Sequence, residues 1–349
     1  MQATAALAVP ATWYSVGFSS DLPRGRVLSM VFADSDVVLF RTESGAFVML
    51  EAYCPHLGAH LGHGGSVVGD TLRCPFHGFR FDREGACVAT GYGTKIPPKA
   101  RVRSWPVRER HGVLLAYHDP GSREPEWEVP ELDMRGWSPF VSHVWTLRGH
   151  PQEIAENSVD LGHFTAVHRY PEATLTALEI DGPLLVASYR FERKTTIAGM
   201  AFPLRVDFDA QVYGPGYGLV DVRLPALGLR LRQLVLAVPT EKGQIDLRVA
   251  LSSRELRRTG KLGKPLATMI TRALFPLVKN DVSQDFAIWK NKRYVERPSL
   301  AAGDGPIAQY RKWAAQFYEG ETATASRRAL PLLGAEHGEQ QESAASLRS

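Results

Sequence analysis

The chain has 349 residues and a formal net charge of +4, and its apolar and charged fractions are 44% and 22%. This composition is typical of a globular protein, and the length allows two or three domains. The mild charge does not indicate nucleic-acid binding, and no apolar run approaches the roughly 18 residues that a membrane span needs. The apolar start lacks a basic leader and is interrupted by Pro10, so we expect a mature N-terminus rather than a signal peptide.

Residues 12–118 predict a small all-β domain. Short β segments alternate with Gly, Asp and Ser turns; they are VVLFRT, FVMLEAY, ACVATG and GVLLAYH. The three cysteines, Cys54, Cys74 and Cys87, all lie in this region. So few cysteines in a long chain, and an odd number of them, argue against the disulfide framework of a secreted protein. We therefore expect a cytoplasmic protein with a metal site.

Two loops of this region each supply one cysteine and one histidine: Cys54 with His56, and Cys74 with His77. Two thiolates and two imidazoles could bind zinc, but common zinc modules pair like ligands, as in C-x2-C with H-x3-H. One cysteine and one histidine from each loop suit a two-iron cluster, in which one iron takes both cysteines and the other takes both histidines. The spacing favours a [2Fe–2S] cluster, with zinc as the alternative.

The remaining histidines and cysteine of this stretch do not fit the ligand pattern. His60 and His63 are interpreted as solvated loop residues. Cys87 lies on a β segment and is interpreted as a buried thiol.

Residues 119–132 are rich in Pro and Glu and predict a linker, and residues 150–169 predict a helix that carries Asp160, His163 and His168. Five residues correspond to about 140° around a helix, so a regular helix would not place both histidines on one face. They could share a metal only if the helix is distorted or ends between them. Asp160 and His163, three residues apart, would share a face. The alternative is an amphipathic helix with unrelated polar residues.

The rest of the chain predicts strands and then helices. Strands are expected over about 178–252, helices over about 264–296 and 306–318, and a disordered tail over 319–349. The sequence thus predicts an α+β fold, with an all-β domain over 1–118 and a larger domain over 133–318. In the larger domain, helices flank an antiparallel sheet.

A carboxylate on the helix over 264–296 is a candidate third metal ligand. On an ideal helix, Asp285 lies about 30° from the centre of an apolar stripe, and Asp281 about 70° from it. The stripe consists of Val278, Val282, Phe286, Ile288 and Trp289. A carboxylate within an apolar face is costly unless a cation neutralises it, so Asp285 is preferred and Asp281 is held in reserve. Two histidines and one carboxylate form the facial triad of mononuclear non-haem iron.

These motifs resemble those of one family. CPHLGAHLG and CPFHGFRFD resemble the cluster loops of Rieske proteins, and N-x-x-D-x-x-H-x4-H, from Asn157 to His168, resembles the iron motif of Rieske non-haem iron oxygenases. QDFAIWKNKRY and DGPIAQYRKWAAQFY resemble the C-terminal part of the steroid-acting branch, which contains bacterial 3-ketosteroid 9α-hydroxylase oxygenase components and sterol 7-desaturases. The similarity runs from WYSVGF to FYEG and implies a catalytic domain of the helix-grip type.

The resemblance implies a terminal oxygenase that hydroxylates or desaturates a C–H bond of a hydrophobic polycyclic, steroid-like or sterol-like substrate. Such enzymes use O2 and electrons from NAD(P)H, supplied by a separate reductase with or without a ferredoxin. The resemblance also implies a homotrimer in which Asp160 bridges the Rieske cluster of one subunit and the iron of the next. It implies a Rieske [2Fe–2S] cluster and a mononuclear Fe(II), with the ligand sets Cys54, His56, Cys74, His77 and His163, His168, Asp285.

Three alternatives to this function remain open. One is the same chemistry on another natural product or on an aromatic compound. Another is an electron carrier without oxygenase activity. The third is a zinc-stabilised binding module.

Two further motifs are less specific. GDGPIA at 303–308 is a near match to a dinucleotide fingerprint, but it contains a proline and follows no strand, so we expect the nicotinamide to bind elsewhere. RELRRTGKLGKP at 254–265 could dock an acidic electron donor or could be a solvated loop. The apolar residues of the strands over 178–252 suggest that these strands wall an apolar substrate pocket.

Overall fold

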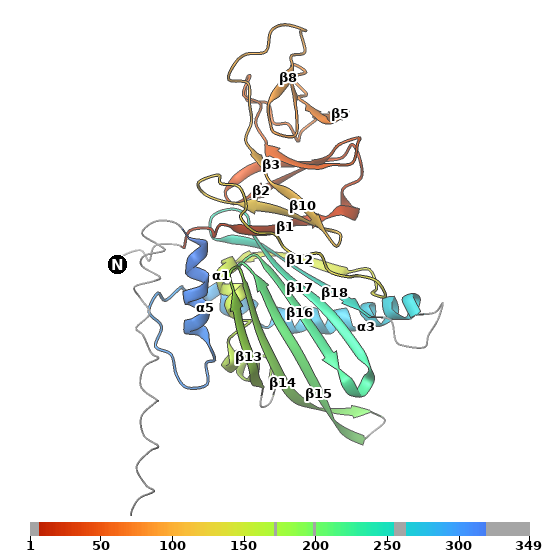
Figure 1. The fold of residues 1–349 in the computed structure, drawn as a ribbon, viewed down its shortest axis with the longest axis vertical. Helices are drawn as coiled ribbons and strands as arrows, with labels where there is room; N and C mark the ends of the chain where they lie inside the picture. Colours follow the sequence, from red (N-terminus) through yellow and green to blue (C-terminus); the bar gives the residue numbers. More distant parts are fainter. Residues whose placement is uncertain (1–6, 171–172, 198–199, 255–262, 319–349) are drawn as a thin grey trace, which may run out of the picture.

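The computed structural model describes residues 7–170, 173–197, 200–254 and 263–318. Two small sheets and a three-stranded sheet are stacked at one end of a large twisted sheet (Figure 1). The sheet-rich α+β fold expected from the sequence is confirmed. The expected tail over 319–349, and most of the basic stretch at 254–265, lie outside the described residues.

The strands up to residue 118 form three antiparallel sheets. β1 (Thr12–Phe18), β11 (Val113–His118) and β10 (Val107–Arg110) form the first. The second has the order β2 (Val27–Phe32), β3 (Ser35–Arg41), β4 (Phe47–Glu51) and β9 (Ser104–Trp105). The third contains β5 (Ser66–Val68), β6 (Thr71–Arg73), β7 (Arg80–Phe81) and β8 (Cys87–Ala89). The loop that carries Cys54 precedes β5 and leads into this third sheet. The loop that carries Cys74 follows β6, the second strand of the sheet.

The large sheet has seven antiparallel strands in the order β12-β18-β17-β16-β15-β14-β13. Their bounds are β12 Val141–Arg148, β13 Thr174–Asp181, β14 Leu184–Ile197, β15 Met200–Tyr213, β16 Tyr217–Leu224, β17 Leu229–Pro239 and β18 Gln244–Ser253. The strands expected over 178–252 are present. β12 and the start of β13 were not expected.

The two faces of this sheet differ in polarity. On β15, Val206, Phe208 and Ala210 face a cavity, while the alternate residues Asp207 and Asp209 lie on the opposite, outer face. The outer face carries ion pairs across the strands, namely Arg190–Asp207, Arg223–Asp209 and Arg232–Asp221. This alternation is what a period of two residues produces in a strand that is buried on one side.

An apolar cluster joins the three-stranded sheet to the large sheet. Trp13 of β1 and Leu115 of β11 are buried against Tyr217 and Leu219 of β16 and Leu234 of β17. These two parts of the chain therefore share a core.

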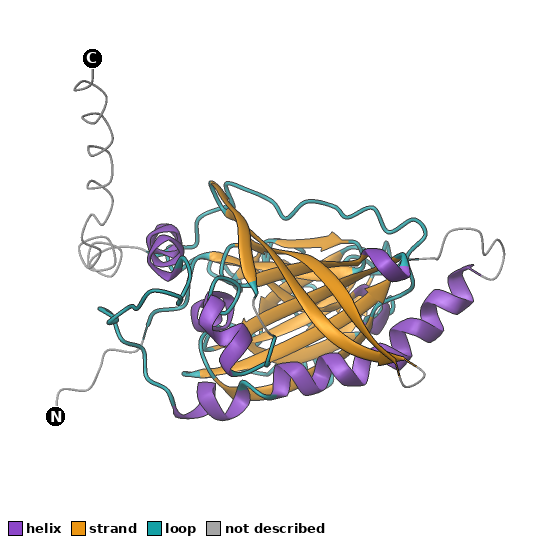
Figure 2. Ribbon diagram, turned by 90° about the horizontal axis from the view of Figure 1, so that it is seen from below, coloured by secondary structure: helices purple, strands orange, loops and turns teal. Residues whose placement is uncertain are grey.

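The helices lie against the edge and the inner face of the large sheet (Figures 1 and 2). They are α1 (Pro151–Glu156), α2 (Leu161–Ala166), α3 (Gly263–Ser283), α4 (Phe286–Asn291) and α5 (Ile307–Ala314). α3 packs on β18 and β12, as expected for helices flanking an antiparallel sheet. Among the described residues, none of the helices combines the length and the apolar character needed to cross a bilayer.

Both long helices expected from the sequence are interrupted. The helix expected over 150–169 is two short helices, because the Asp160 side chain accepts a hydrogen bond from His163 N and caps a new helix there. The helix expected over 264–296 ends at Ser283 and restarts after Asp285. The prediction of one continuous apolar stripe was therefore wrong at Ile288, a residue that is 44% exposed.

Candidate metal centre and cavity

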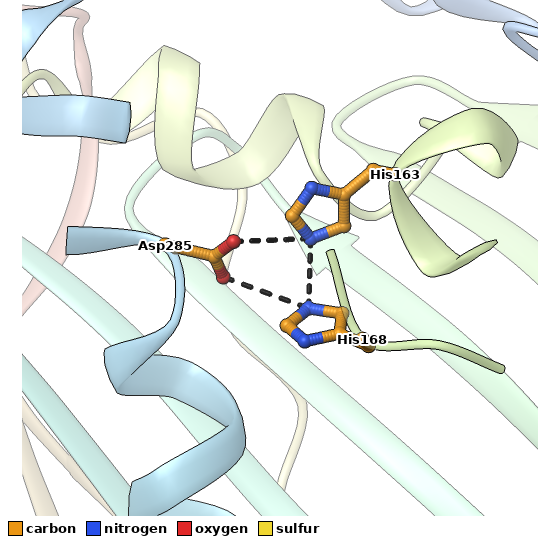
Figure 3. A group of neighbouring side chains, drawn as sticks. All are labelled: His163, His168 and Asp285. Atoms are coloured by element: carbon orange, nitrogen blue, oxygen red, sulfur yellow. Dashed lines mark hydrogen bonds and ion pairs between the residues drawn. The ribbon is translucent and has the colours of Figure 1, made fainter. Parts of the chain in front are cut away.

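His163, His168 and Asp285 converge on one point (Figure 3). His163 Nε2 lies 2.8 Å from His168 Nε2, and the Asp285 oxygens Oδ1 and Oδ2 lie 3.3 Å from His163 Nε2 and 3.6 Å from His168 Nε2. Across the described ranges, no other group of three or more His, Cys, Asp or Glu side chains has its ligand atoms within 4.8 Å of one another. Atoms bound about 2.1 Å from one ion and about 90° apart would be separated by about 3 Å. The three side chains therefore fit a shared metal ion.

The end of α2 brings the two histidines together. α2 ends at Ala166, and the chain then turns through Arg169, whose φ is 57°, so that Tyr170 N donates to Phe164 O at 2.8 Å. His168 thus lies beyond the helix and returns toward His163. This is the condition that the spacing of five residues required.

Asp285 reaches the histidines from the break between α3 and α4. Its side chain is buried, with only 4% of the residue exposed. Asp281, one turn earlier, accepts a hydrogen bond from Tyr170 Oη at 2.8 Å and lies outside the group of three. The structure brings Asp285, rather than Asp281, to the histidines.

The electrostatics of this group favour a bound cation. Burial, together with the smaller effects of His168 and Lys292, lowers the pKa of His163 to about 4. Burial, with the neighbouring Asp160 and Asp281, raises the pKa of Asp285 to about 7, and its buried Oδ1 has no hydrogen-bond partner. Neutral imidazoles and a buried carboxylate oxygen without a hydrogen-bond partner are suitable ligands for a divalent metal, which would stabilise this arrangement.

Asp160 lies at the N-terminus of α2. Its Oδ1 accepts a hydrogen bond from the backbone N–H of His163 at 2.9 Å, and burial raises the pKa of its carboxyl. The expectation that Asp160 and His163 share a helix face was wrong, because Asp160 precedes the helix as its N-cap. Asp160 nevertheless lies next to a metal-site histidine, which the cap holds in place.

The GDGPIA segment packs against the start of α2. Leu161 N donates to Asp304 O at 3.0 Å, and a Cβ on Gly305 would overlap the Val159 carbonyl oxygen. Gly305 also has a φ of 86°, which favours glycine. The segment therefore supports the turn that leads to Asp160, which explains its glycine without a dinucleotide.

α5 is joined to α1 by a partly buried ion pair. Arg311 Nε and Nη2 donate to the two Glu156 carboxylate oxygens at 2.7 and 2.9 Å. Tyr310 Oη donates to Gln152 O at 2.6 Å. Arg311 and Glu156 lie 155 residues apart, and nothing local in the sequence indicates that they pair.

The candidate cluster ligands form two pairs. Cys54 and Cys74 are buried, and burial together with the adjacent Cys74 thiol raises the pKa of Cys54 to about 11. The His56 and His77 ring centroids lie 4.7 Å apart. A single tetrahedral zinc would hold all four ligand atoms within about 4 Å of one another, but these atoms do not form such a group. The pairing of cysteine with cysteine and histidine with histidine fits a two-iron cluster.

The neighbours of these loops behave largely as expected. His60 and His63 lie beside each other, with ring centroids 4.4 Å apart, and His60 Nδ1 accepts a hydrogen bond from Gly62 N at 3.1 Å. Cys87 is buried, and its thiol donates to Ala89 O at 3.3 Å. Around the two cluster-side histidines, Leu57, Phe76 and Tyr92 are exposed; we call these three residues the apolar collar.

A cavity of about 750 Å³ lies between the inner face of the large sheet and α3. Its wall is largely apolar and includes Phe208, Val220, Leu231, Leu274 and Val278. His163, His168 and Asp285 form part of the same wall. The volume lies in the range of small-molecule sites, so the metal group faces a space that suits an apolar ligand.

Both parts of the chain match known protein families. Residues 12–106 match the Rieske [2Fe-2S] domain, and residues 116–318 match the 3-ketosteroid 9alpha-hydroxylase C-terminal domain. The chain belongs to the Rieske oxygenases of the 3-ketosteroid 9α-hydroxylase type. The family resemblance expected from the motifs is thus confirmed, and the chain is an oxidoreductase with a Rieske [2Fe–2S] domain.

Two curated relatives represent the two activities within this branch. A probable 3-ketosteroid-9-alpha-monooxygenase oxygenase component of Rhodococcus rhodochrous is 31% identical, over 88% of this chain and 79% of the relative. Cholesterol 7-desaturase nvd 1 of Ciona intestinalis is 30% identical, over 88% of this chain and 68% of the relative.

Solved structures of Rieske oxygenases share the fold. Dicamba monooxygenase bound to 3,6-dichlorosalicylic acid superposes with a TM-score of 0.70 at 22% identity, covering 90% of this chain and 98% of the other. A Pseudomonas putida CBB5 NdmA mutant with caffeine gives a TM-score of 0.69 at 17% identity, covering 94% and 97%. At these identities the likeness concerns the fold alone.

Proposed function

We propose that the chain is the terminal oxygenase component of a multi-component system that hydroxylates or desaturates a C–H bond of a steroid-like or sterol-like substrate. It would use O2 and electrons from NAD(P)H through a separate reductase, with or without a ferredoxin. The observation that carries the proposal is the buried group of His163, His168 and Asp285 in the wall of a largely apolar cavity. The steroid and sterol activities of the relatives support the substrate class.

In this proposal, His163 Nε2, His168 Nε2 and the Asp285 carboxylate hold a mononuclear iron. Cys54 and Cys74 with His56 and His77 hold the [2Fe–2S] cluster. When bound, the cluster stores single electrons and the iron supplies the reduction of O2 and the attack on the C–H bond. Three protein ligands would leave positions open on a bound metal, and all three side chains line the cavity that would hold the substrate.

The chain's own contribution is to bind the substrate, orient it and exclude water. The wall formed by β15, β16, β17 and α3 offers aliphatic and aromatic side chains to a hydrocarbon skeleton. Burial of that skeleton is favourable in proportion to its apolar area. The substrate is thereby held next to the metal group in a site with little water.

We further propose a homotrimer in which Asp160 connects the metal group of one chain to the cluster of the next. Within one chain, the third sheet and its cluster loops lie at the opposite end of the molecule from the lower part of the large sheet (Figure 1). The apolar collar of Leu57, Phe76 and Tyr92 is exposed around the cluster-side histidines, as a subunit contact would require. Light scattering should give a mass near three times 38.5 kDa.

Turnover of a panel of steroids and sterols tests the function. The purified protein is supplied with NADH and a surrogate reductase, and products are identified by mass spectrometry, with 18O2 to trace oxygen. We expect a hydroxylated or desaturated steroid, and about three iron atoms per chain. Turnover of other natural products or of small aromatic compounds alone would support the other substrate classes. Two iron atoms per chain without turnover would support an electron carrier.

A further inference from the structure

Gln233 is a polar side chain in an apolar part of the cavity wall. It lies on β17, where it pairs with Val220 of β16 and Leu251 of β18, and all three residues line the cavity. Directly paired residues of antiparallel strands point to the same face of a sheet. The Gln233 amide therefore points toward the cavity, with Leu231 and Val235 on either side of it along the strand.

In the part of the chain that the structure describes, the Gln233 amide makes no hydrogen bond. Gln211 of β15 differs, because it alternates with Ala210 and its amide is bonded on the outer face of the sheet: Gln211 Oε1 accepts from Tyr213 Oη at 3.0 Å, and Gln211 Nε2 donates to Asp221 Oδ2 at 3.5 Å. A primary amide offers two donors and one acceptor, and leaving them unpaired among apolar groups is unfavourable. A ligand oxygen in the cavity would pair with them.

Gln233 lies at a distance from the metal group. Gln233 lies in the middle of β17, whereas Pro239 at the end of that strand lines a second pocket together with Trp289 of α4, the helix that follows Asp285. A rigid ligand held at Gln233 by one end would therefore present a carbon further along its skeleton to His163, His168 and Asp285.

We propose that the Gln233 side-chain amide binds a ketone or hydroxyl oxygen at one end of the substrate and thereby selects the carbon that faces the metal group. The inference rests on the proposed function and deepens it. The preferred substrate is then a rigid polycyclic molecule with an oxygen remote from the reacting carbon, and a polycyclic hydrocarbon without that oxygen is a poor one.

Binding of three steroids that differ by single oxygens tests this inference. The holoenzyme is titrated under nitrogen with androst-4-ene-3,17-dione, androst-4-en-3-one and androst-4-en-17-one. We expect the dione to bind about tenfold more tightly than one of the two single-oxygen analogues. Gln233→Leu should remove this preference by weakening both the dione and the analogue that keeps the recognised oxygen, while the other analogue binds as it does to the parent protein. Gln233→Met, of similar length, is a second variant in case the first folds poorly, and iron content reports on folding.

Gln211→Leu is the matched control, because the Gln211 amide is already bonded within the protein. It should keep the preference of the parent protein for the dione. The products give a second readout: the parent protein should yield one main regioisomer, and Gln233→Leu a mixture.

The outcomes separate the inference from the proposed function. If the parent protein binds and converts steroids, but both Gln233 variants keep the preference for the dione and the single product, the inference is overturned and the function stands. If the parent protein neither binds nor converts any steroid, the substrate class fails and the inference fails with it.

Discussion

Each of the three side chains of the candidate metal centre lies at or near a helix end. His163 lies in the first turn of α2, His168 lies beyond its end, and Asp285 occupies the break before α4. Helix ends leave backbone groups unpaired and allow sharp changes of direction. Two histidines five residues apart can therefore meet, which a continuous helix would prevent.

Asp285→Ala should remove the mononuclear metal and leave the cluster intact. Turnover should fall by more than about a hundredfold, since even residues that only orient ligands affect activity by 10–100-fold. Iron analysis should lose one atom per chain while the visible spectrum of the cluster is unchanged. Asp281→Asn is the control and should retain the metal, because Asp281 pairs with Tyr170. Full turnover by Asp285→Ala would refute the ligand assignment.

Asp160→Asn tests the proposed connection between subunits. Asn caps helices about as well as Asp, so α2 and both metal sites should persist. The loss of the negative charge should slow the reoxidation of the reduced cluster when substrate and O2 are added, as measured by stopped-flow absorbance. An unchanged rate would show that Asp160 serves only as a cap.

At the scale of elements, the position of α2 depends on the segment at 303–306. Gly305 packs against the Val159 carbonyl, and Asp304 O accepts from Leu161 N. The metal-site helix is thus supported by a segment that lies more than a hundred residues later in the chain. A change in this segment should affect the metal group without touching it.

Gly305→Ala and Gly303→Ala form a matched pair for testing this support. Both glycines have positive φ, 86° and 106°, so both variants carry similar backbone strain. Only Gly305 has backbone atoms in the way of a Cβ, whereas nothing lies within 4 Å of that position at Gly303. Gly305→Ala should therefore weaken the mononuclear metal site more, as measured by iron loss to a chelator over time. Equal losses would show that the close packing does not support the site.

The sequence predicted the strands, and the three side chains that converge at the candidate metal centre, better than the helix boundaries. The apolar surroundings of Asp285 were visible in the helical period, even though the helix breaks beside it. Asp160 was placed inside a helix because local pattern does not distinguish an aspartate on a helix face from one that caps a new helix. Gln233 could have been noticed, since it continues the alternation of Leu229 and Leu231 against Arg230 and Arg232.

For the whole molecule, contacts between residues far apart in the chain could not be predicted from local sequence patterns. The ion pair between Arg311 and Glu156 and the packing of Gly305 on Val159 join residues roughly 150 positions apart. Neither leaves a periodic signal in the sequence. The division of the chain at a linker over 119–132 stays a prediction, as do the trimer and the partner proteins.

Two buried histidines should make the folded protein sensitive to acid. Burial lowers the pKa values of His111 and His118 to about 4, from an ordinary 6.5. Below pH 6.5 these histidines take up protons in the unfolded chain but not in the folded chain. Their contribution to the free energy of unfolding is therefore complete above pH 6.5 and is lost as the pH falls toward 4. The loss approaches about 3 kcal/mol for each histidine.

Urea unfolding at a series of pH values measures this dependence. His118→Gln should flatten the decline of the free energy of unfolding between pH 6.5 and 4 by the contribution of one histidine. Between pH 7 and 8, histidine is neutral in both the folded and the unfolded state. In that range the free energy of unfolding should change with pH equally in the variant and in the parent protein. The same slope in both proteins over the acid range would contradict the assignment to His118.

The two faces of the large sheet separate substrate choice from folding stability. On β15, the residues that line the cavity alternate with the aspartates of the outer ion pairs. A substitution at Val206, Phe208 or Ala210 would reshape the space for the substrate, while Asp207 and Asp209 would keep their partners. New substrate preferences could therefore arise through single changes at alternate positions along a strand, with the cross-strand scaffold unaltered.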